Sequence, residues 1–222
     1  MITNLKRLSI VLALVFISIN AKAQLTIKAG LTSADISLSD NSGALDQLNK
    51  AKKGLHFGIF RDKKMNDLLS FETGLMFDQK GMKRITEVGS VTTTDIMNIA
   101  YLQLPVALKI GLDVNDDVRI FGKLGGYGAY GLSGKLDTEV VTSGVVSSTT
   151  ASDLNIGTDV AAGDQVKPID FGGEVGVGIQ YKSFSFEMDL GMGLANIATD
   201  TSSGEDFKNK EFKFTLGYSF GK

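Results

Sequence analysis

Apolar and polar residues alternate along most of this chain. In Phe184–Leu194 every second residue is Phe, Met or Leu, and the residues between them are Ser, Glu, Asp and Gly. Tyr101–Ile110 and Glu211–Phe220 show the same alternation. Successive side chains of a β-strand point to opposite faces, so this period of two residues predicts strands with one apolar and one polar face.

Five further segments repeat the alternation more weakly. They are Leu25–Ser33, Gly54–Arg61, Leu69–Lys80, Val118–Gly131 and Ile169–Tyr181. The total is eight strands of roughly 9–13 residues, the length that a tilted strand needs to cross a bilayer. An even number lets an antiparallel sheet close with both chain ends on one side. The fold class predicted is therefore all-β, an eight-stranded antiparallel, up-and-down transmembrane β-barrel.

The connections between these strands alternate in length. Four are long, at about 34–53, 81–98, 132–168 and 195–210; three are short, at Asp62–Leu68, Leu112–Asp117 and Lys182-Ser183. Outer-membrane barrels have long outer loops and short periplasmic turns. The alternation predicts an outer-membrane barrel with periplasmic chain ends. Val140–Asp164, rich in Ser, Thr, Gly, Ala and Val, is predicted to be a mobile external loop.

The polar face carries nearly balanced charges with glycines between them. The charged residues are Lys28, Lys80, Lys109, Arg119, Lys123 and Lys213, with Glu72, Asp78, Asp170, Glu174, Glu187, Asp189 and Glu211. The glycines are Gly74, Gly172, Gly176, Gly178, Gly191 and Gly193. Glycine weakens a strand in water, but it leaves room for long side chains in a narrow lumen. This pattern favours a membrane barrel over a soluble, lipocalin-like barrel.

The N-terminus has the features of a secretory signal peptide. Lys6 and Arg7 precede an apolar run from Leu8 to Ile19, and Ala21-Lys22-Ala23 matches a small-x-small cleavage site. The run is shorter than the ~20 residues of a spanning helix. Residues 1–23 are therefore predicted to be removed, which leaves 24–222 as one barrel domain in the outer membrane.

Composition excludes several classes of function. Lys and Arg number 23 against 25 Asp and Glu, which gives no basic field for nucleic acid. The chain has no Cys and one His, so thiolate chemistry and a multi-His metal site are excluded. No cofactor, metal or catalytic residue is predicted.

One histidine and one pair of carboxylates in the lumen resemble catalytic groups, but a simpler interpretation accounts for each. His56 is predicted to lie on the same strand face as Gly58, toward the lumen. Some outer-membrane hydrolases use a His with a Ser or carboxylate. A lumen His hydrogen-bonded to a carboxylate explains it better. Glu187 and Asp189 lie on one strand face about 7 Å apart. Paired carboxylates serve acid/base chemistry, yet the nearby lysines favour an ion-pair network.

Three further features have structural interpretations. Asp113, Asn115, Asp116 and Asp117 lack the 12-residue spacing and closing Glu of a calcium loop, so a tight turn explains them. The run Gly122–Gly131 has no strand-to-helix context for phosphate binding and is predicted to be a strand, with a bulge or sharp bend between Gly122 and Gly128. Pro105, on the lumen phase, predicts a bulge or local break in its ladder.

Several segments resemble the PorT-like outer-membrane β-barrel family. These are Ile27–Leu31, Phe71–Gly81 with its Gln-Lys-Gly stretch, and Tyr101-Leu102-Gln103-Leu104-Pro105. The resemblance covers nearly the whole chain after the signal peptide, except about 140–165. It implies an eight-stranded outer-membrane barrel; one family member acts in protein secretion and gliding, a role that does not transfer by fold.

The sequence leads to a non-enzymatic protein with a structural or interaction role in the cell envelope. Its expected partners are outer-membrane lipid and envelope proteins that contact its loops, and an accessory role in protein secretion follows from family analogy alone. Two alternatives stay open: a narrow channel for ions or small solutes, and a membrane-embedded lipid or peptide hydrolase.

Overall fold

Strands make up most of the chain that the computed structural model describes, which is residues 24–39, 49–202, 204 and 206–220. They are β1 (Gln24–Ser39), β2 (Asn49–Lys64), β3 (Leu69–Val88), β4 (Val91–Asp113), β5 (Val118–Thr142), β6 (Val145–Leu154), β7 (Ile169–Tyr181), β8 (Phe184–Gly193) and β9 (Asp206–Phe220). A short 3₁₀ helix, η2, spans Val160–Ala162. Within these ranges no helix is long and apolar enough to cross a membrane. The predicted signal peptide, residues 1–23, lies outside the described residues.

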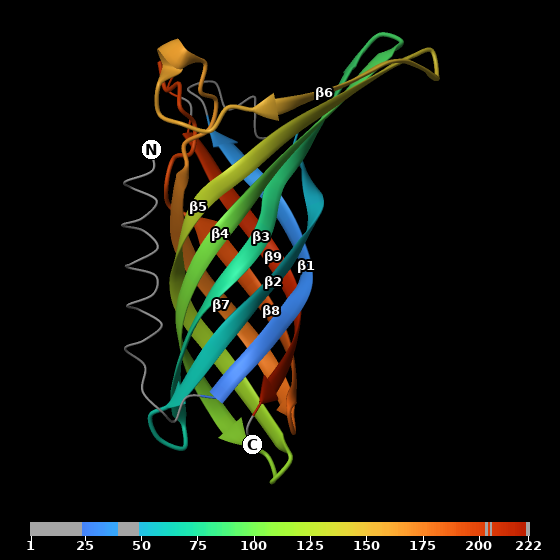
Figure 1. Cartoon of the computed structure of the whole chain (residues 1–222). Helices are drawn as coiled ribbons and strands as arrows, with labels where there is room; N and C mark the ends of the chain where they lie inside the picture. Colours follow the sequence, from blue (N-terminus) through green and yellow to red (C-terminus); the bar gives the residue numbers. More distant parts are fainter. Residues whose placement is uncertain (1–23, 40–48, 203, 205, 221–222) are drawn as a thin grey trace.

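Eight of the strands close into an antiparallel barrel (Figure 1). Each pairs with its neighbour in the order β1-β2-β3-β4-β5-β7-β8-β9, and β9 returns to β1 along a ladder from Leu25↔Phe220 to Ser39↔Asp206. Closure satisfies the backbone of every strand without leaving an edge in lipid. The predicted eight-stranded barrel is therefore confirmed, and the ninth strand, β6, lies outside the ring.

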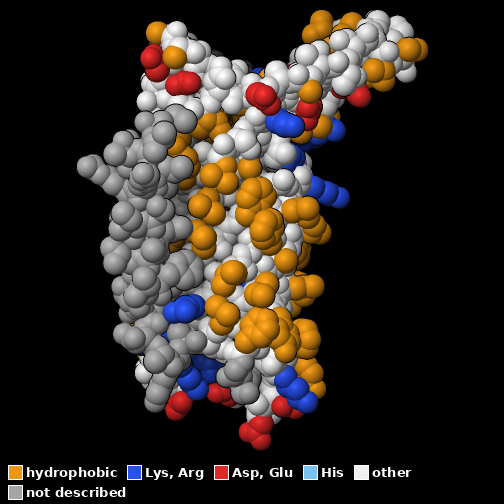
Figure 2. All heavy atoms as spheres, in the orientation of Figure 1, with side chains coloured by type: hydrophobic (Ala, Val, Ile, Leu, Met, Phe, Trp, Pro, Cys, Tyr) orange, Lys and Arg blue, Asp and Glu red, His pale blue; other side chains and the backbone are white. Residues whose placement is uncertain are grey.

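The two faces of the strands are oriented as the alternation predicts. Leu190 is 55% exposed on the outer surface, whereas Asp189 beside it is 2% exposed and points into the lumen. Figure 2 shows a band of hydrophobic side chains over the barrel wall. Of the predicted polar-face charges, all except the half-buried Arg119 are buried. Arg119 and Lys123, in the Gly-rich strand, therefore lie on the lumen face of that strand.

Glycines make room for these buried charges, as predicted. A Cβ atom on Gly176 would lie 1.8 Å from Asp189 Oδ1, and one on Gly191 would lie 2.6 Å from the Glu211 side chain. Neither position accepts a larger residue unless the carboxylate moves. The narrow lumen therefore depends on glycine opposite its long side chains.

The short turns and the described chain ends share one end of the barrel (Figure 1). Asn115 Oδ1 accepts hydrogen bonds from the backbone N–H groups of Asp117 and Val118, both at 2.9 Å, which confirms the predicted tight turn. Short turns are periplasmic in outer-membrane barrels. We therefore infer that the opposite end, where the longer hairpins project, is extracellular.

Two of the predicted long loops are mainly strand. Residues 81–98 form the upper parts of β3 and β4, joined at Gly89-Ser90, and β5 continues to Thr142 before turning into β6. Together they make a four-stranded antiparallel blade, residues 82–98 and 135–153, that projects beyond the barrel (Figure 1). The prediction of a mobile external loop over Val140–Asp164 is wrong in that Val145–Leu154 is strand β6, because β-branched residues on both sides of a tight turn form a hairpin there.

The other two long loops are also shorter than predicted. β1 continues to Ser39 and β2 begins at Asn49, while β9 begins at Asp206. Irregular chain within the described residues therefore concentrates in 155–168 and 194–202.

Two ladder irregularities were predicted, and one lies where expected. The β3–β4 ladder pairs Thr73 with Val106 and Met76 with Gln103, with no pairs between them opposite Pro105, so the predicted local break is confirmed. The bulge predicted between Gly122 and Gly128 is not there, since pairing with β7 is regular from Val118 to Tyr130. The register shift instead lies where Ala100 and Tyr101 face Ser133 and Gly131.

Candidate functional site

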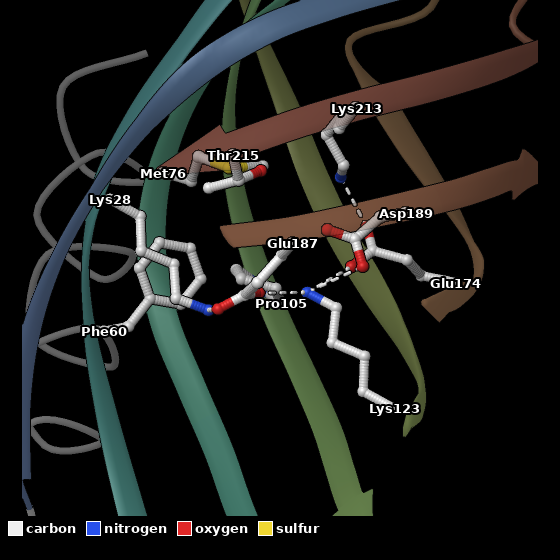
Figure 3. Close-up of a pocket in the computed structure, with 10 residues that line it drawn as sticks. All are labelled: Lys28, Phe60, Met76, Pro105, Lys123, Glu174, Glu187, Asp189, Lys213 and Thr215. Atoms are coloured by element: carbon white, nitrogen blue, oxygen red, sulfur yellow. Dashed lines mark hydrogen bonds and ion pairs between the residues drawn. The ribbon is translucent and has the colours of Figure 1, made fainter. Parts of the chain in front are cut away.

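The lower lumen holds a cluster of ion pairs built from five strands. Lys28 Nζ lies 2.7 Å from both Glu72 Oε2 and Glu187 Oε1. Lys109 Nζ lies 3.0 Å from Glu72 Oε2, and Lys123 Nζ lies 3.1 Å from Glu187 Oε2. Figure 3 shows Lys28 and Lys123 converging on Glu187. Glu187 is shared by two lysines and Glu72 by three, since Lys123 Nζ also lies 3.8 Å from Glu72 Oε1, which confirms the predicted ion-pair network.

This cluster continues upward toward the extracellular end. Lys123 also contacts Asp189 at 3.0 Å, and Lys213 pairs with Glu174 and with Glu211, the latter at 3.1 Å. Above them Lys80 lies 3.3 Å from Glu211 Oε2 and 3.9 Å above the Tyr127 ring. The buried charges thus form one connected network along the lumen.

The cavity at the centre of the network is small. It is lined by Lys28, Phe60, Met76, Pro105, Lys123, Glu174, Glu187, Asp189, Lys213 and Thr215, the residues drawn in Figure 3. Its free space is about that of one water molecule. Side chains therefore fill the lumen at this level.

An apolar cap lies over the network at the extracellular end. Leu154 ends β6, Val166 and Ile197 come from the segments after β6 and β8, and all three pack with Ile36 and Ile99 of the barrel wall. Backbone hydrogen bonds hold these segments together, including Lys167 N–H to Ile197 O at 2.8 Å. The alternation of apolar and polar residues does not predict this cap, whose only signal in the sequence is isolated apolar residues in polar segments.

Arg119 links two turns at the periplasmic end of the lumen. Its guanidinium donates to Asp113 Oδ1 at 2.7 Å and to the carbonyl oxygens of Asp67 and Gly111. These contacts join the β2–β3 and β4–β5 turns. The lumen is thus bounded by an apolar cap above and by linked turns below.

His56 is a buried lumen residue between two threonines. Its Nδ1 and Nε2 lie 2.9 Å from Thr32 Oγ1 and Thr215 Oγ1, respectively. Thr32 donates its hydroxyl hydrogen to Asp78 Oδ1, so the predicted carboxylate is one hydroxyl away rather than in direct contact. Because Thr215 and His56 are both buried in the lumen, the pair does not lie at the lipid boundary, where the hydrolase alternative needs it.

The described residues offer no group of three or more His, Asp or Glu side chains arranged to hold a metal ion. The Asp113–Asp117 turn directs its side chains to local hydrogen bonds and to Arg119 instead. The run Gly122–Gly131 lies entirely within β5.

Similar solved structures are small outer-membrane proteins. Ail of Yersinia pestis is 14% identical, with 90% of this chain and 100% of that chain covered and a TM-score of 0.39. OprG from Pseudomonas aeruginosa is 13% identical, with 90% and 97% covered and a TM-score of 0.41. Neisserial surface protein A is 13% identical, with 88% and 97% covered and a TM-score of 0.38.

A comparison with curated proteins found no match. The family model described as "Outer membrane protein beta-barrel domain" matches residues 18–199, most of the chain. The closed eight-stranded ring and its lipid-facing band agree with that match. This chain therefore belongs to the outer membrane protein β-barrel domain family, and it is located in the outer membrane.

Proposed function

We propose that this protein is a non-enzymatic interaction protein whose extracellular blade binds an extended segment of another protein. The observation that carries this proposal is the free edge of β6. Among the described strands β6 pairs only with β5, and nine of its ten residues are exposed. Its second edge therefore presents backbone N–H and C=O groups to a partner strand.

The composition of β6 supports binding at that edge. Val145–Ser152 contains no charged residue and no proline, which are the usual means of preventing edge-to-edge pairing. On the opposite edge of the same blade, Lys83 and Arg84 of upper β3 pair with β2, and Glu87 lies beyond that ladder. That edge is thus paired at its base and charged beyond it, whereas the β6 edge is uncharged, as expected for a strand that accepts a partner.

The filled lumen argues against the channel alternative. Ion pairs occupy the lower lumen, the central cavity has room for about one water, and the apolar cap lies above. A planar-bilayer recording should show no steady conductance above that of the lipid alone. An accessory role in protein secretion, which the PorT-like resemblance suggests, is a more specific form of this proposal. Identifying the protein crosslinked in the experiment below tests it.

Photo-crosslinking in intact cells tests the proposal. A photoreactive residue at Thr149 on β6 should give a protein adduct, while one at Thr86 on the charged edge should not. Adding Ser147→Lys to the Thr149 probe should abolish the adduct, because a lysine on an edge strand discourages pairing. Equal adducts at both positions, or an adduct that persists with the lysine, would show that the β6 edge is not the binding site.

A further inference from the structure

Three lysines stand on the outer surface just above the lipid-facing band. Lys50 and Lys53 belong to β2 and Lys83 to β3; we name them the rim cluster. Lys50 is directly opposite Lys83 in the β2–β3 ladder. Lys53 shares its face with Leu55, which is 55% exposed in the band. Figure 2 shows Lys and Arg side chains between the hydrophobic band and the blade.

A ladder irregularity brings the three onto one face. Lys50 and Lys53 are three residues apart, so a regular strand would place them on opposite faces. The register of β2 against β3 shifts between Ala51 and His56, and this extra residue restores the same facing. The chain therefore departs from regular pairing at the point where the cluster forms.

Among the described residues, no carboxylate lies within ion-pair distance of the rim cluster. Within the described part of the chain, none of its lysines forms an ion pair with a carboxylate, whereas each of the five buried lumen lysines contacts at least two. At the periplasmic turns Lys64, Arg119 and Lys182 each have a carboxylate partner, while Lys63, also exposed there, has none among the described residues. Positive charge without a paired carboxylate is therefore grouped in the rim cluster, whereas Lys63 is a single such residue at the periplasmic end.

Like charges directly opposite each other destabilise a sheet. The Lys50–Lys83 pair, with Lys53 nearby, is thus unfavourable unless an anion lies against it. Leu55, two residues from Lys53, still faces the hydrocarbon, so the lysines lie at the level of the lipid headgroups. Lysine near a membrane surface is attracted to anionic headgroups, and phosphate is a common ligand for its ammonium group.

We infer that the rim cluster binds the phosphate group of an anionic lipid in the outer leaflet. This lipid site is independent of the proposed β6 binding edge, because Lys50, Lys53 and Lys83 lie on β2 and β3 at the base of the blade. The bound lipid would hold the base of the blade at a fixed height above the bilayer.

A binding comparison in nanodiscs tests the inference. The full mature chain is inserted into phosphatidylcholine nanodiscs that contain diphosphoryl lipid A, and native mass spectrometry counts the lipid A molecules that remain bound. The triple variant Lys50→Gln, Lys53→Gln, Lys83→Gln should lose at least about tenfold in lipid A retention. The corresponding Lys→Arg triple should retain it, since charge is preserved, and retention should fall as salt is raised.

A matched control removes the same charge at the other end of the barrel. Lys63→Gln, Lys64→Gln, Lys182→Gln should leave retention unchanged. Circular dichroism and heat-modifiable migration confirm that each variant is folded. Equal retention by the rim triple and the native chain, or an equal loss in the periplasmic control, overturns the inference. Displacement of lipid A by millimolar inorganic phosphate also overturns it, because the site would then bind free anions.

Discussion

Adjacent residues on one strand of this barrel have opposite environments, and β8 shows the contrast clearly. Leu190 faces lipid and Asp189 faces the charged lumen. Replacing Leu190 with Arg would place a charge in hydrocarbon, at a cost of about 2–4 kcal/mol near the midplane. Folding titrations into lipid vesicles measure this change, with Leu190→Met as the control of similar volume. A cost for Leu190→Arg no greater than for Leu190→Met would mean that the two faces are assigned backwards.

Removing a cation from the lumen network should cost more stability than neutralising a carboxylate. The buried lumen charges are five lysines and seven carboxylates, so neutralising one carboxylate leaves every lysine with a partner. Asp189→Asn should therefore cost less than about 1.5 kcal/mol. Lys123→Met removes the cation that contacts Glu72, Glu174, Glu187 and Asp189, and it should cost about 3–5 kcal/mol. The same titrations compare the two variants, and equal costs would show that Lys123 does not hold these carboxylates together.

The sequence predicts which face a residue occupies but not its partner. Alternation assigns Glu187 and Lys28 to the lumen, because period 2 is a local property of a strand. Their contact joins positions 159 residues apart, and it depends on the stagger of the closed ring, which no single strand encodes. The burial of the network was likewise not predictable, since the cap that covers it comes from segments without periodicity.

At the scale of whole elements, strand positions were predictable where one face meets lipid and were missed where both faces meet water. The upper parts of β3 and β4 and all of β6 lack hydrophobic alternation, because neither face is in hydrocarbon. The sequence signal that remained for these strands was the type of residue at each hairpin turn. Gly89-Ser90 is a typical two-residue hairpin turn, and Ser143 and Gly144 both have positive φ, as a type I′ turn requires.

The β5–β6 half of the blade should be separable from the barrel. The pair Leu136↔Ser152 lies at its base, so a two-residue Asn-Gly turn can replace 137–151 without changing the register of β5. The deleted residues are mostly exposed, and Leu154 of the cap is kept. This variant should insert into vesicles with a melting temperature close to that of the native chain and should lose the Thr149-dependent partner. Failure of insertion would mean that the β5–β6 hairpin is needed for barrel folding. A partner retained after trimming would place binding elsewhere.

At the scale of the whole molecule, the two ends of the barrel differ in structure. Linked turns lie at one end; the cap, the rim cluster and the blade lie toward the other. Successive connections of an antiparallel barrel lie at opposite ends, so short periplasmic turns and long outer connections alternate along the chain. The topology was therefore predictable from connection lengths, even though two of the long loops proved to be hairpins. The proposed β6 edge and lipid site both depend on the blade end being extracellular.

That orientation can be tested with single cysteines, because the chain contains none of its own. Ser90→Cys lies in the β3–β4 turn of the blade and Asp116→Cys in the short β4–β5 turn, and both positions are exposed. A large membrane-impermeant maleimide should label Ser90→Cys in intact cells and Asp116→Cys only after the outer membrane is opened. Matched labelling of both variants in lysed cells is the control for reactivity. The reverse pattern in intact cells would place the blade in the periplasm; the rim cluster would then meet the inner leaflet, and the β6 edge could bind only periplasmic partners.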